Sequence, residues 1–503
     1  MPRGIHSQPD EILAQIFKEH VEWADEDILH VADGPWFLSH VCRSWRMTVL
    51  DHPELWSIVR VAQPDMFDSD AYIGDSDSDE EIDSEDSASE YGGLSSHNSA
   101  RNALLLLNLA LERSQNYPLE VKLEFDTAVD DVATASLRHM GVKDSSTSLL
   151  PHRLIRAVVA HSNRWKKVDL QIAAGFMPLF APIQNRLSLL TNFTLATFGD
   201  SAPPFLYAQN APSLATVTLV EYSHEIVPVP WESIRHFSET QIMPRRAAAN
   251  VVDRFLRLLR QNPNLEVLEV SYPSMAPSQS SLTHRSLRRL TINEGNLIRC
   301  LTLPRLEQLT AEVDNDTAAA IRDLLKRSKC SLRHLHLIDF TLDEDVLAIL
   351  SGSTKLHTLI LRLTGWNPRV KKTMELLVKK LAEPSFLPGL EDLDIIISQE
   401  HEFDPEPMSS PCQITFINDA FVDMLAGRWG RRLAPKGGAY LKTVFVLVEL
   451  PSTVGLSKTR GVARLQKLCD EGMDLFVRAR DPRALDLREA AKDISYVYKD
   501  IAV

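Results

Sequence analysis

Hydrophobic positions in the first sixty residues recur at the spacing of amphipathic helices. Ser7, Pro9 and Asp10 favour a helix start, because serine and aspartate cap free backbone N–H groups and proline fits the first turn. The apolar residues of this first helix fall on one face: Ile12, Leu13, Ile16 and Phe17. A second helix, ending before Pro53, is predicted by another apolar face: Leu38, Val41, Cys42, Trp45 and Val49.

Farther along the chain, the six-residue pattern Leu-x-x-Leu-x-Leu recurs. Its clearest copies begin at Leu265, Leu287, Leu306, Leu332, Leu356 and Leu390, with spacings of 22, 19, 26, 24 and 34 residues. Weaker copies begin at Trp165, Leu190, Leu214, Ile234 and Leu441. The alternation within each copy predicts a strand, and segments between copies, such as 253–260 and 318–327, have helical spacing. A strand and a helix repeated at this interval form the unit of an α/β solenoid.

A stretch of different composition separates these two patterns. Residues 62–100 are rich in serine and acidic residues, and positions 65–90 hold twelve Asp or Glu and no Lys or Arg. Such a segment cannot bury enough apolar surface to offset its ordering entropy, so we expect a disordered linker. Ser76, Ser78 and Ser87 each precede an acidic residue by three positions, which suits an acidophilic kinase. An inert solvated linker explains the same composition without modification.

Three blocks near the N-terminus resemble the F-box family, in particular the F-box-like proteins of mushroom-forming fungi. The family pattern is roughly Leu-Pro-x-Glu-Ile-Leu-x-x-Ile-Phe, then Val-Cys-x-x-Trp-Arg, then Pro-x-Leu-Trp. The matching residues are Pro9, Glu11, Ile12, Leu13, Ile16, Phe17, Val41, Cys42, Trp45, Arg46, Pro53, Leu55 and Trp56. Gln8 stands where the family carries leucine. A small helical subdomain of any other kind would also show a capped amphipathic helix and an aromatic-rich one.

The resemblance implies a helical module that docks on the Skp1-type adaptor of a cullin-based ubiquitin ligase. We expect the adaptor contact to involve Pro9, Ile12, Leu13, Ile16, Phe17, Leu38, Val41, Cys42, Trp45, Leu55 and Trp56. The chain would then comprise an F-box-like helical domain at 1–61, the acidic linker at 62–100, and an irregular leucine-rich-repeat domain with a C-terminal cap at 101–503. The expected fold class is α/β, with the repeats forming a horseshoe-like solenoid.

The repeat pattern also predicts a binding surface. The leucines of each copy point into the core, so the residues that flank the second leucine point to the opposite, concave face. These flanking positions include Val267, Thr291, Thr310, Thr358 and Ile360. The positions we expect to contact a target protein are Glu269, Arg289, Gln308, His334, His336, Asp392 and Asp394. Each of them could equally be a merely solvated strand residue.

Composition narrows the functional class. Of the chain's net charge of −14, the segment 65–90 supplies −12, which leaves the body nearly neutral and gives no sign of a nucleic-acid-binding surface. The longest apolar run, 103–111, is too short to span a membrane, and no secretion signal is visible. Five dispersed cysteines indicate a reducing compartment, so we expect a cytoplasmic or nuclear protein.

No catalytic, cofactor or metal site is predicted. Residues 455–459 contain Lys-Thr but lack the glycine that a phosphate-binding loop places before the lysine. His334 and His336 share a strand face, but no Cys, Asp or Glu nearby has a spacing that completes a metal site. Cys412 and His401 invite comparison with a Cys–His nucleophile, yet three prolines between them indicate a loop.

The expected function is therefore that of a substrate-recruiting, non-enzymatic subunit of a Skp1–cullin–F-box ubiquitin ligase. It would bind the adaptor and, through it, a cullin, and would hold an unknown target protein on the repeats. A second hypothesis is a leucine-rich-repeat scaffold that binds a protein without any ligase. A third, a hydrolase in an irregular α/β fold, requires a deep polar pocket that converges on Cys, His or Asp.

Overall fold

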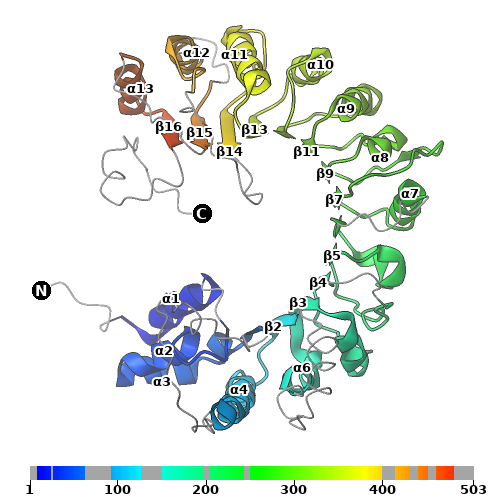
Figure 1. Ribbon diagram of the computed structural model, residues 1–503, viewed down its shortest axis with the longest axis vertical. Helices are drawn as coiled ribbons and strands as arrows, with labels where there is room; N and C mark the ends of the chain where they lie inside the picture. Colours follow the sequence, from blue (N-terminus) through cyan, green and yellow to red (C-terminus); the bar gives the residue numbers. More distant parts are fainter. Residues whose placement is uncertain are drawn as a thin grey trace, which may run out of the picture. The chain divides into compact units, whose positions relative to one another are not determined.

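The computed structural model describes residues 8–23, 27–62, 92–125, 150–197, 203–242, 250–398, 414–430, 440–450 and 460–480. The chain divides into two compact units, Met1–Met243 and Pro244–Val503. Both are mixed α/β structures built on parallel strands (Figure 1). Most of the predicted acidic linker, residues 63–91, lies outside the described residues.

The first unit begins with three helices and continues as strands with intervening helices. Its helices are α1 (Asp10–Trp23), α2 (Gly34–Val41), α3 (Arg43–Asp51), η2 (Pro53–Trp56), α4 (Gly92–Arg113), α6 (Leu150–Ala160), η4 (Ser162–Arg164), η5 (Ala174–Ile183), η6 (His224–Ile226) and η7 (Trp231–Ser233). Its strands are β1 (Ile58–Ala62), β2 (Leu119–Phe125), β3 (Trp165–Ile172), β4 (Asn192–Ala196), β5 (Thr216–Val220) and β6 (His236–Thr240). The strands are parallel and neighbour one another in chain order.

The second predicted helix is in fact two helices, and this corrects the sequence prediction. Cys42 has an extended backbone, with φ −157° and ψ 173°, and separates α2 from α3. Its sulfur accepts a hydrogen bond from the Trp45 N–H at 3.5 Å, so Cys42 caps α3. The Arg46 Nε donates to the Ser39 carbonyl at 2.8 Å, which joins the two helices across the break. The apolar spacing across Cys42 therefore belongs to two helices packed together.

Strand β1 joins the N-terminal helices to the rest of the first unit. It pairs in parallel with β2, so that Ile58 lies opposite Glu120 and Ala62 opposite Glu124. The predicted domain boundary at residue 61 thus falls inside a strand of the sheet. Helix α4 begins at Gly92, within the stretch predicted as linker, and its later half is anchored by buried residues such as Leu107 and Leu111. Once the later half of α4 is anchored, each further residue toward the N-terminus adds one backbone hydrogen bond, which favours extension of the helix into the stretch predicted as linker.

The second unit repeats a strand–helix step. Its strands are β7 (Val267–Ser271), β8 (Leu282–Thr283), β9 (Arg289–Ile292), β10 (Leu301–Thr302), β11 (Gln308–Glu312), β12 (His334–Ile338), β13 (Thr358–Thr364), β14 (Asp392–Ser398), β15 (Thr443–Glu449) and β16 (Asp474–Arg480). Its helices are α7 (Val251–Gln261), α8 (Gly295–Cys300), α9 (Asn315–Ser328), α10 (Glu344–Gly352), α11 (Pro368–Ala382), α12 (Asp419–Trp429) and α13 (Arg460–Asp470). Strands β8 and β10 pair with each other apart from the main sheet.

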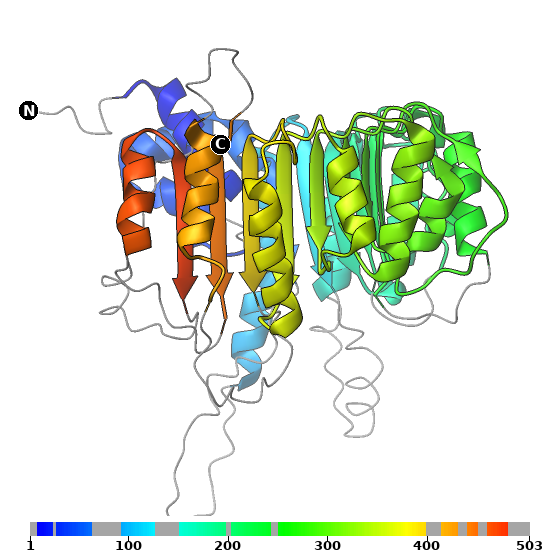
Figure 2. The ribbon, with the colours of Figure 1, turned by 90° about the horizontal axis from the view of Figure 1, so that it is seen from above.

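Helices cover one face of the main sheet in the second unit. Figures 1 and 2 show α11, α12 and α13 lying along one side of the yellow to red strands β13 to β16. We call the opposite face the open sheet face. Four of the helices begin at an Asp or Asn whose side-chain oxygen accepts a first-turn N–H, namely Asp314, Asp343, Asn367 and Asn418.

The Leu-x-x-Leu-x-Leu copies form the strands that the sequence predicts. The second leucine of successive copies is buried and in register, as with Leu290, Leu309 and Leu335. One backbone contact recurs at the steps from β7 to β15 of the main sheet: the carbonyl before a strand accepts two consecutive N–H groups of the next repeat. The carbonyl of Glu307, for example, accepts from Arg333 and His334 at 2.8 and 3.1 Å. The same local geometry is therefore built repeatedly from different sequences.

Among the helices that the structure describes, none combines the length and the apolar character needed to cross a bilayer.

Buried Arg164 stabilises the packing of the first unit through its hydrogen bonds. Its buried guanidinium donates to the carbonyls of Ser114 and Tyr117 and to the Ser114 hydroxyl, at 2.6–3.1 Å. We expect Arg164→Met to lower the free energy of unfolding by about 1–3 kcal/mol, because buried carbonyls lose their donors. Urea denaturation measures this, and Arg156→Met on the exposed face of α6 is the control. Equal loss in both variants would contradict the assignment.

His284 makes the stability of the second unit depend on pH. It is buried, its Nε2 donates to the Asn262 carbonyl at 2.9 Å, and its Nδ1 accepts from the Leu287 N–H at 3.2 Å, so the ring is neutral. Burial lowers the pKa of His284 below its ordinary value. The unfolded chain then binds a proton first as pH falls below about 6.5, and unfolding becomes easier.

His284→Asn keeps a hydrogen-bond acceptor but cannot titrate. We expect wild type to lose more unfolding free energy than this variant between pH 7.5 and 5.5, measured by urea denaturation. Parallel losses in the two proteins would show that His284 does not carry the dependence.

Candidate functional site

The N-terminal helices expose apolar side chains in addition to those they bury. Helices α1, α2 and α3 each present a pair at helical spacing: Ile12 and Ile16, Phe37 and Val41, Met47 and Leu50. We call these six side chains the apolar helix surface. Ile12 is 49% exposed and Ile16 is 40% exposed. Seven of the fourteen large apolar residues exposed in the described part of the chain lie between Ile12 and Leu50, so exposed apolar area is concentrated here.

The structure divides the predicted adaptor-contact residues into two groups. Five are buried within the first unit: Leu13, Phe17, Leu38, Leu55 and Trp56. A buried side chain cannot reach a partner while the helices stay folded, so we correct the prediction for these five, which instead hold the helices together. The others are accessible: Pro9, Ile12, Ile16 and Val41 are exposed, and Cys42 and Trp45 are half-buried. For these six, adaptor contact stays a prediction.

Aromatic rings form the core beneath the apolar helix surface. Phe17 of α1 packs on Trp45 of α3 with ring centroids 4.7 Å apart. Trp36 packs edge-on against Trp56, also at 4.7 Å. The Nε1 groups of Trp36 and Trp56 donate to backbone carbonyls at 2.8 Å, so both buried indoles are satisfied. Such a core keeps the three helices in one arrangement and therefore keeps the exposed pairs in place.

Arg113 connects these helices to α4. Its guanidinium lies 4.5 Å from the Trp56 ring centroid and 5.0 Å from that of Trp36, within cation–π range. Burial lowers the pKa of Arg113 from its ordinary value. Together with the β1–β2 pairing, this contact holds the N-terminal helices to the rest of the first unit at two points. Neither Trp36 nor Arg113 was predicted from the sequence; Gly34-Pro35 before Trp36 was the available signal, since proline favours a helix start.

The second candidate surface is the open sheet face of the second unit. The predicted target-contact residues lie on it in two rows that the strand register defines. Arg289, Gln308, His334 and Asp392 belong to one row, and Glu269, His336 and Asp394 to the next. Arg289 and His334 are exposed and the other five are half-buried. The structure therefore brings all seven to one face, while their contact with a target stays a prediction.

On this face, the pKa values of two histidines are lowered and the pKa of one aspartate is raised. Burial, followed by the charge of His357, lowers the pKa of His334, and burial also lowers the pKa of His336. Burial and the neighbouring Asp392 raise the pKa of Asp394. Both histidine shifts favour the neutral imidazole, and the shift of Asp394 favours the protonated carboxyl.

The same face becomes apolar toward the C-terminal strands, where the sequence pattern had placed Ile360 but none of the other apolar residues. Strands β13 to β16 continue beyond the six-residue leucine core. With the end of β12, they add half-buried residues to the open face: Ile338, Ile360, Ile396, Phe445, Leu447 and Phe476. Phe445 and Phe476 stack with centroids 4.8 Å apart and an interplanar angle of 9°. The face thus combines carboxylates with aromatic and aliphatic side chains.

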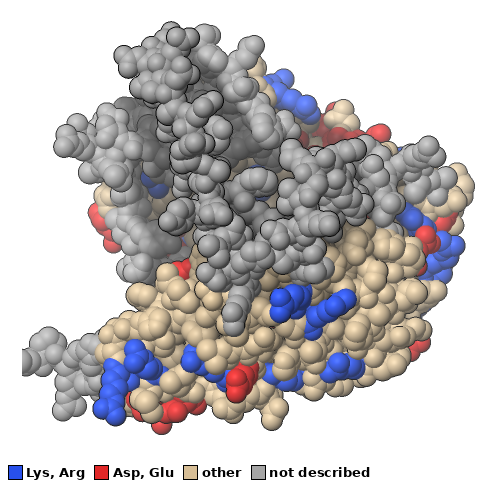
Figure 3. All heavy atoms as spheres, turned by 60° about the horizontal axis from the view of Figure 1, so that its bottom comes forward, with Lys and Arg blue, Asp and Glu red and all other residues tan. Residues whose placement is uncertain are grey.

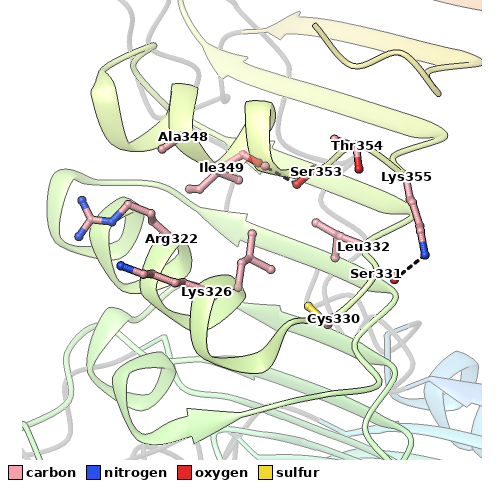
Figure 4. Close-up of a pocket in the computed structure, with 12 residues that line it drawn as sticks. Arg322, Lys326, Cys330, Ser331, Leu332, Ala348, Ile349, Ser353, Thr354 and Lys355 are labelled. Atoms are coloured by element: carbon pink, nitrogen blue, oxygen red, sulfur yellow. Dashed lines mark hydrogen bonds between the residues drawn. The ribbon is translucent and has the colours of Figure 1, made fainter. Parts of the chain in front are cut away.

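A cavity of about 400 Å³ lies between α9 and α10 (Figure 4). Arg322 and Lys326 lie at one end, and Lys355, whose Nζ donates to Ser331 Oγ at 3.2 Å, lies at the other. Arg322 is already paired with Asp323 and Asp345. Burial raises the pKa of the Cys330 thiol, which keeps it protonated and a poor nucleophile. The lining groups do not converge on a point where a reaction could occur.

Most of the other candidate residues for chemistry cannot be placed in the described part of the chain. Cys412, His401 and residues 455–459 lie outside the described residues. Within the described ranges, no group of three or more His, Cys, Asp or Glu is placed to hold a metal ion. On the face in Figure 3, acidic and basic side chains are scattered among uncharged ones.

Comparison with known proteins adds no assignment. The sequence matches no protein-family model, and no curated protein matches it.

The two groups of motif residues should respond differently to a charge. Leu13→Asp places a carboxylate in the aromatic core and should lower unfolding free energy by about 3 kcal/mol or more. Ile16→Asp adds the same charge to an exposed position and should change it by about 0.5 kcal/mol. Tryptophan fluorescence during urea denaturation includes a signal from this region, because three of the chain's eight tryptophans, Trp36, Trp45 and Trp56, lie there. Similar losses for both variants would refute the division.

Proposed function

We propose that this protein is the substrate-recruiting subunit of a Skp1–cullin–F-box ubiquitin ligase. Helices α1 to α3 with η2 serve as the F-box module. The strand–helix repeats serve as an irregular leucine-rich-repeat solenoid that holds a target protein. No residue of the chain is given a catalytic role, because the complex acts by bringing the target close to a ubiquitin-charged enzyme.

The observation that carries the proposal is the apolar helix surface. A soluble protein rarely concentrates exposed apolar side chains in a small module unless a partner covers them. Here the F-box-like motif supplies both the buried aromatic core and the exposed Ile12, Ile16 and Val41. Full burial of one such side chain contributes about 1.5–3 kcal/mol, and each 1.4 kcal/mol is tenfold in affinity. A few anchors therefore suffice for a stable adaptor complex, even with Gln8 in place of leucine.

The repeats support the other half of the proposal. Strands with buried leucines in register, with helices on one side of the sheet, leave the other sheet face for a protein ligand. We place the protein in the cytoplasm or nucleus, where such ligases act. Cys42, Cys300, Cys330 and Cys469 form no disulfide with one another, as is usual for proteins of a reducing compartment.

Co-purification with a Skp1-type adaptor tests the proposal. Wild-type chain should bind the adaptor, and Ile12→Asp/Ile16→Asp should weaken binding by about tenfold or more, because two apolar anchors become charged. Calorimetry or a pull-down with purified proteins measures this. Leu376→Asp is the matched control, because Leu376 on α11 is as exposed as Ile16, at 40%.

Two outcomes would reject the ligase assignment. The first is a folded wild-type chain that does not bind the adaptor, which would favour the scaffold hypothesis. The second is an Ile12→Asp/Ile16→Asp variant that binds as tightly as the Leu376→Asp control.

A further inference from the structure

The C-terminal strands of the open sheet face carry an aromatic pair beside two carboxylates. Phe445 and Phe476 stack face to face on β15 and β16. On the neighbouring β14, Asp392 and Asp394 point to the same face, because they are two residues apart on one strand. The register places Asp394 between Ile360 and Phe445. Acid, aliphatic and aromatic groups therefore adjoin one another on this face.

The two carboxylates differ in how they are satisfied. Asp392 accepts a hydrogen bond from the Thr358 hydroxyl at 3.1 Å. No hydrogen bond or ion pair from the described residues reaches the carboxylate of Asp394, although this side chain is half-buried. A half-buried carboxylate next to a second one is electrostatically unfavourable unless a cation approaches. The raised pKa of Asp394 reflects the same condition.

In this part of the open sheet face, the carboxylates and the arginines lie in different rows. Asp474 lies in the row of Asp392, two strands away, and is the second carboxylate of that row. Arg362 and Arg478 lie in the row beyond the aromatic pair. Adjacent rows are separated by two residues, or about 7 Å along the strands. Along the strands, the row of Asp392 and Asp474 therefore comes first, the row that holds Asp394 beside the apolar side chains comes next, and the row of the arginines comes last.

We propose that this face binds a peptide segment of a partner protein in which an arginine or lysine adjoins an apolar side chain. Arg and Lys fit because their aliphatic stems can lie on Ile360 and Phe445 while the charged head reaches Asp392 and Asp394. The adjoining apolar side chain covers the Phe445–Phe476 pair. The inference rests on the proposed role of the open sheet face in holding a target, and it names the chemistry of that target.

Fluorescence anisotropy with synthetic peptides tests the inference on the full chain. The probe is a labelled peptide with one arginine between two leucines in a Gly-Ser background, and its counterpart carries glutamate in place of arginine. Wild type should bind the arginine peptide about tenfold more tightly than the glutamate peptide. Asp392→Asn/Asp394→Asn should remove this discrimination. Asp316→Asn/Asp323→Asn, which removes equal charge from exposed positions on α9, should retain it.

Phe445→Ala separates the apolar contribution from the charge. It should weaken binding of both peptides while leaving the preference for arginine. If the double asparagine variant fails to fold, judged by its thermal melt, Asp394→Asn alone is used, and it should reduce the discrimination.

Three results would overturn the inference. They are equal binding of the two peptides by wild type, no binding of either, and discrimination that survives in a folded Asp392→Asn/Asp394→Asn variant. Self-association of the chain that Phe445→Ala abolishes, without peptide discrimination, would assign the face to a second copy instead. Because no adaptor is present in this assay, failure here leaves the adaptor contact standing, and failure of adaptor binding leaves this result standing.

Discussion

In the main sheet of the second unit, each strand from β9 to β16 buries an apolar side chain beside that of the strand before it, and the geometry of both sheet faces depends on this burial. Leu309 lies in register with Leu290 and Leu335, and all three are buried. A shift of one residue in any strand would turn its leucines to solvent, so the register is strongly determined. The carbonyl that accepts two N–H groups repeats this alignment at the steps from β7 to β15. Side chains of the open face are aligned as a consequence, although their own identities vary.

One short motif gives the N-terminal helices both a packed interior and exposed apolar side chains. Phe17, Trp45 and Trp56 form a packed interior, which fixes the helices without any help from a partner. Ile12, Ile16 and Val41 contribute little to that interior and remain exposed. Arg113 and the β1–β2 pairing then hold these helices to the rest of the first unit. A partner bound to the apolar helix surface would consequently be held in a definite orientation to that unit.

Local patterns in the sequence were sufficient to predict some features and not others. The leucine pattern predicted the strands, because alternation and burial are properties of a few adjacent residues. The break at Cys42 was missed because the apolar spacing continues through it, and only the capping of α3 by its sulfur distinguishes two helices from one. The motif did not separate buried from exposed positions, since Leu13 and Ile12 differ only in how other helices pack on α1. The setting of Asp394 depends on Ile360 and Phe445, which are distant in the chain.

The central claim is that the apolar helix surface exists to be covered by an adaptor. Hydrogen–deuterium exchange on the full chain, with and without a purified Skp1-type adaptor, tests it most directly. The account predicts added protection in peptides from α1, α2 and α3 and no change in the strands β12 to β16. Unchanged exchange in the three helices at saturating adaptor, or protection confined to the strands, would contradict it.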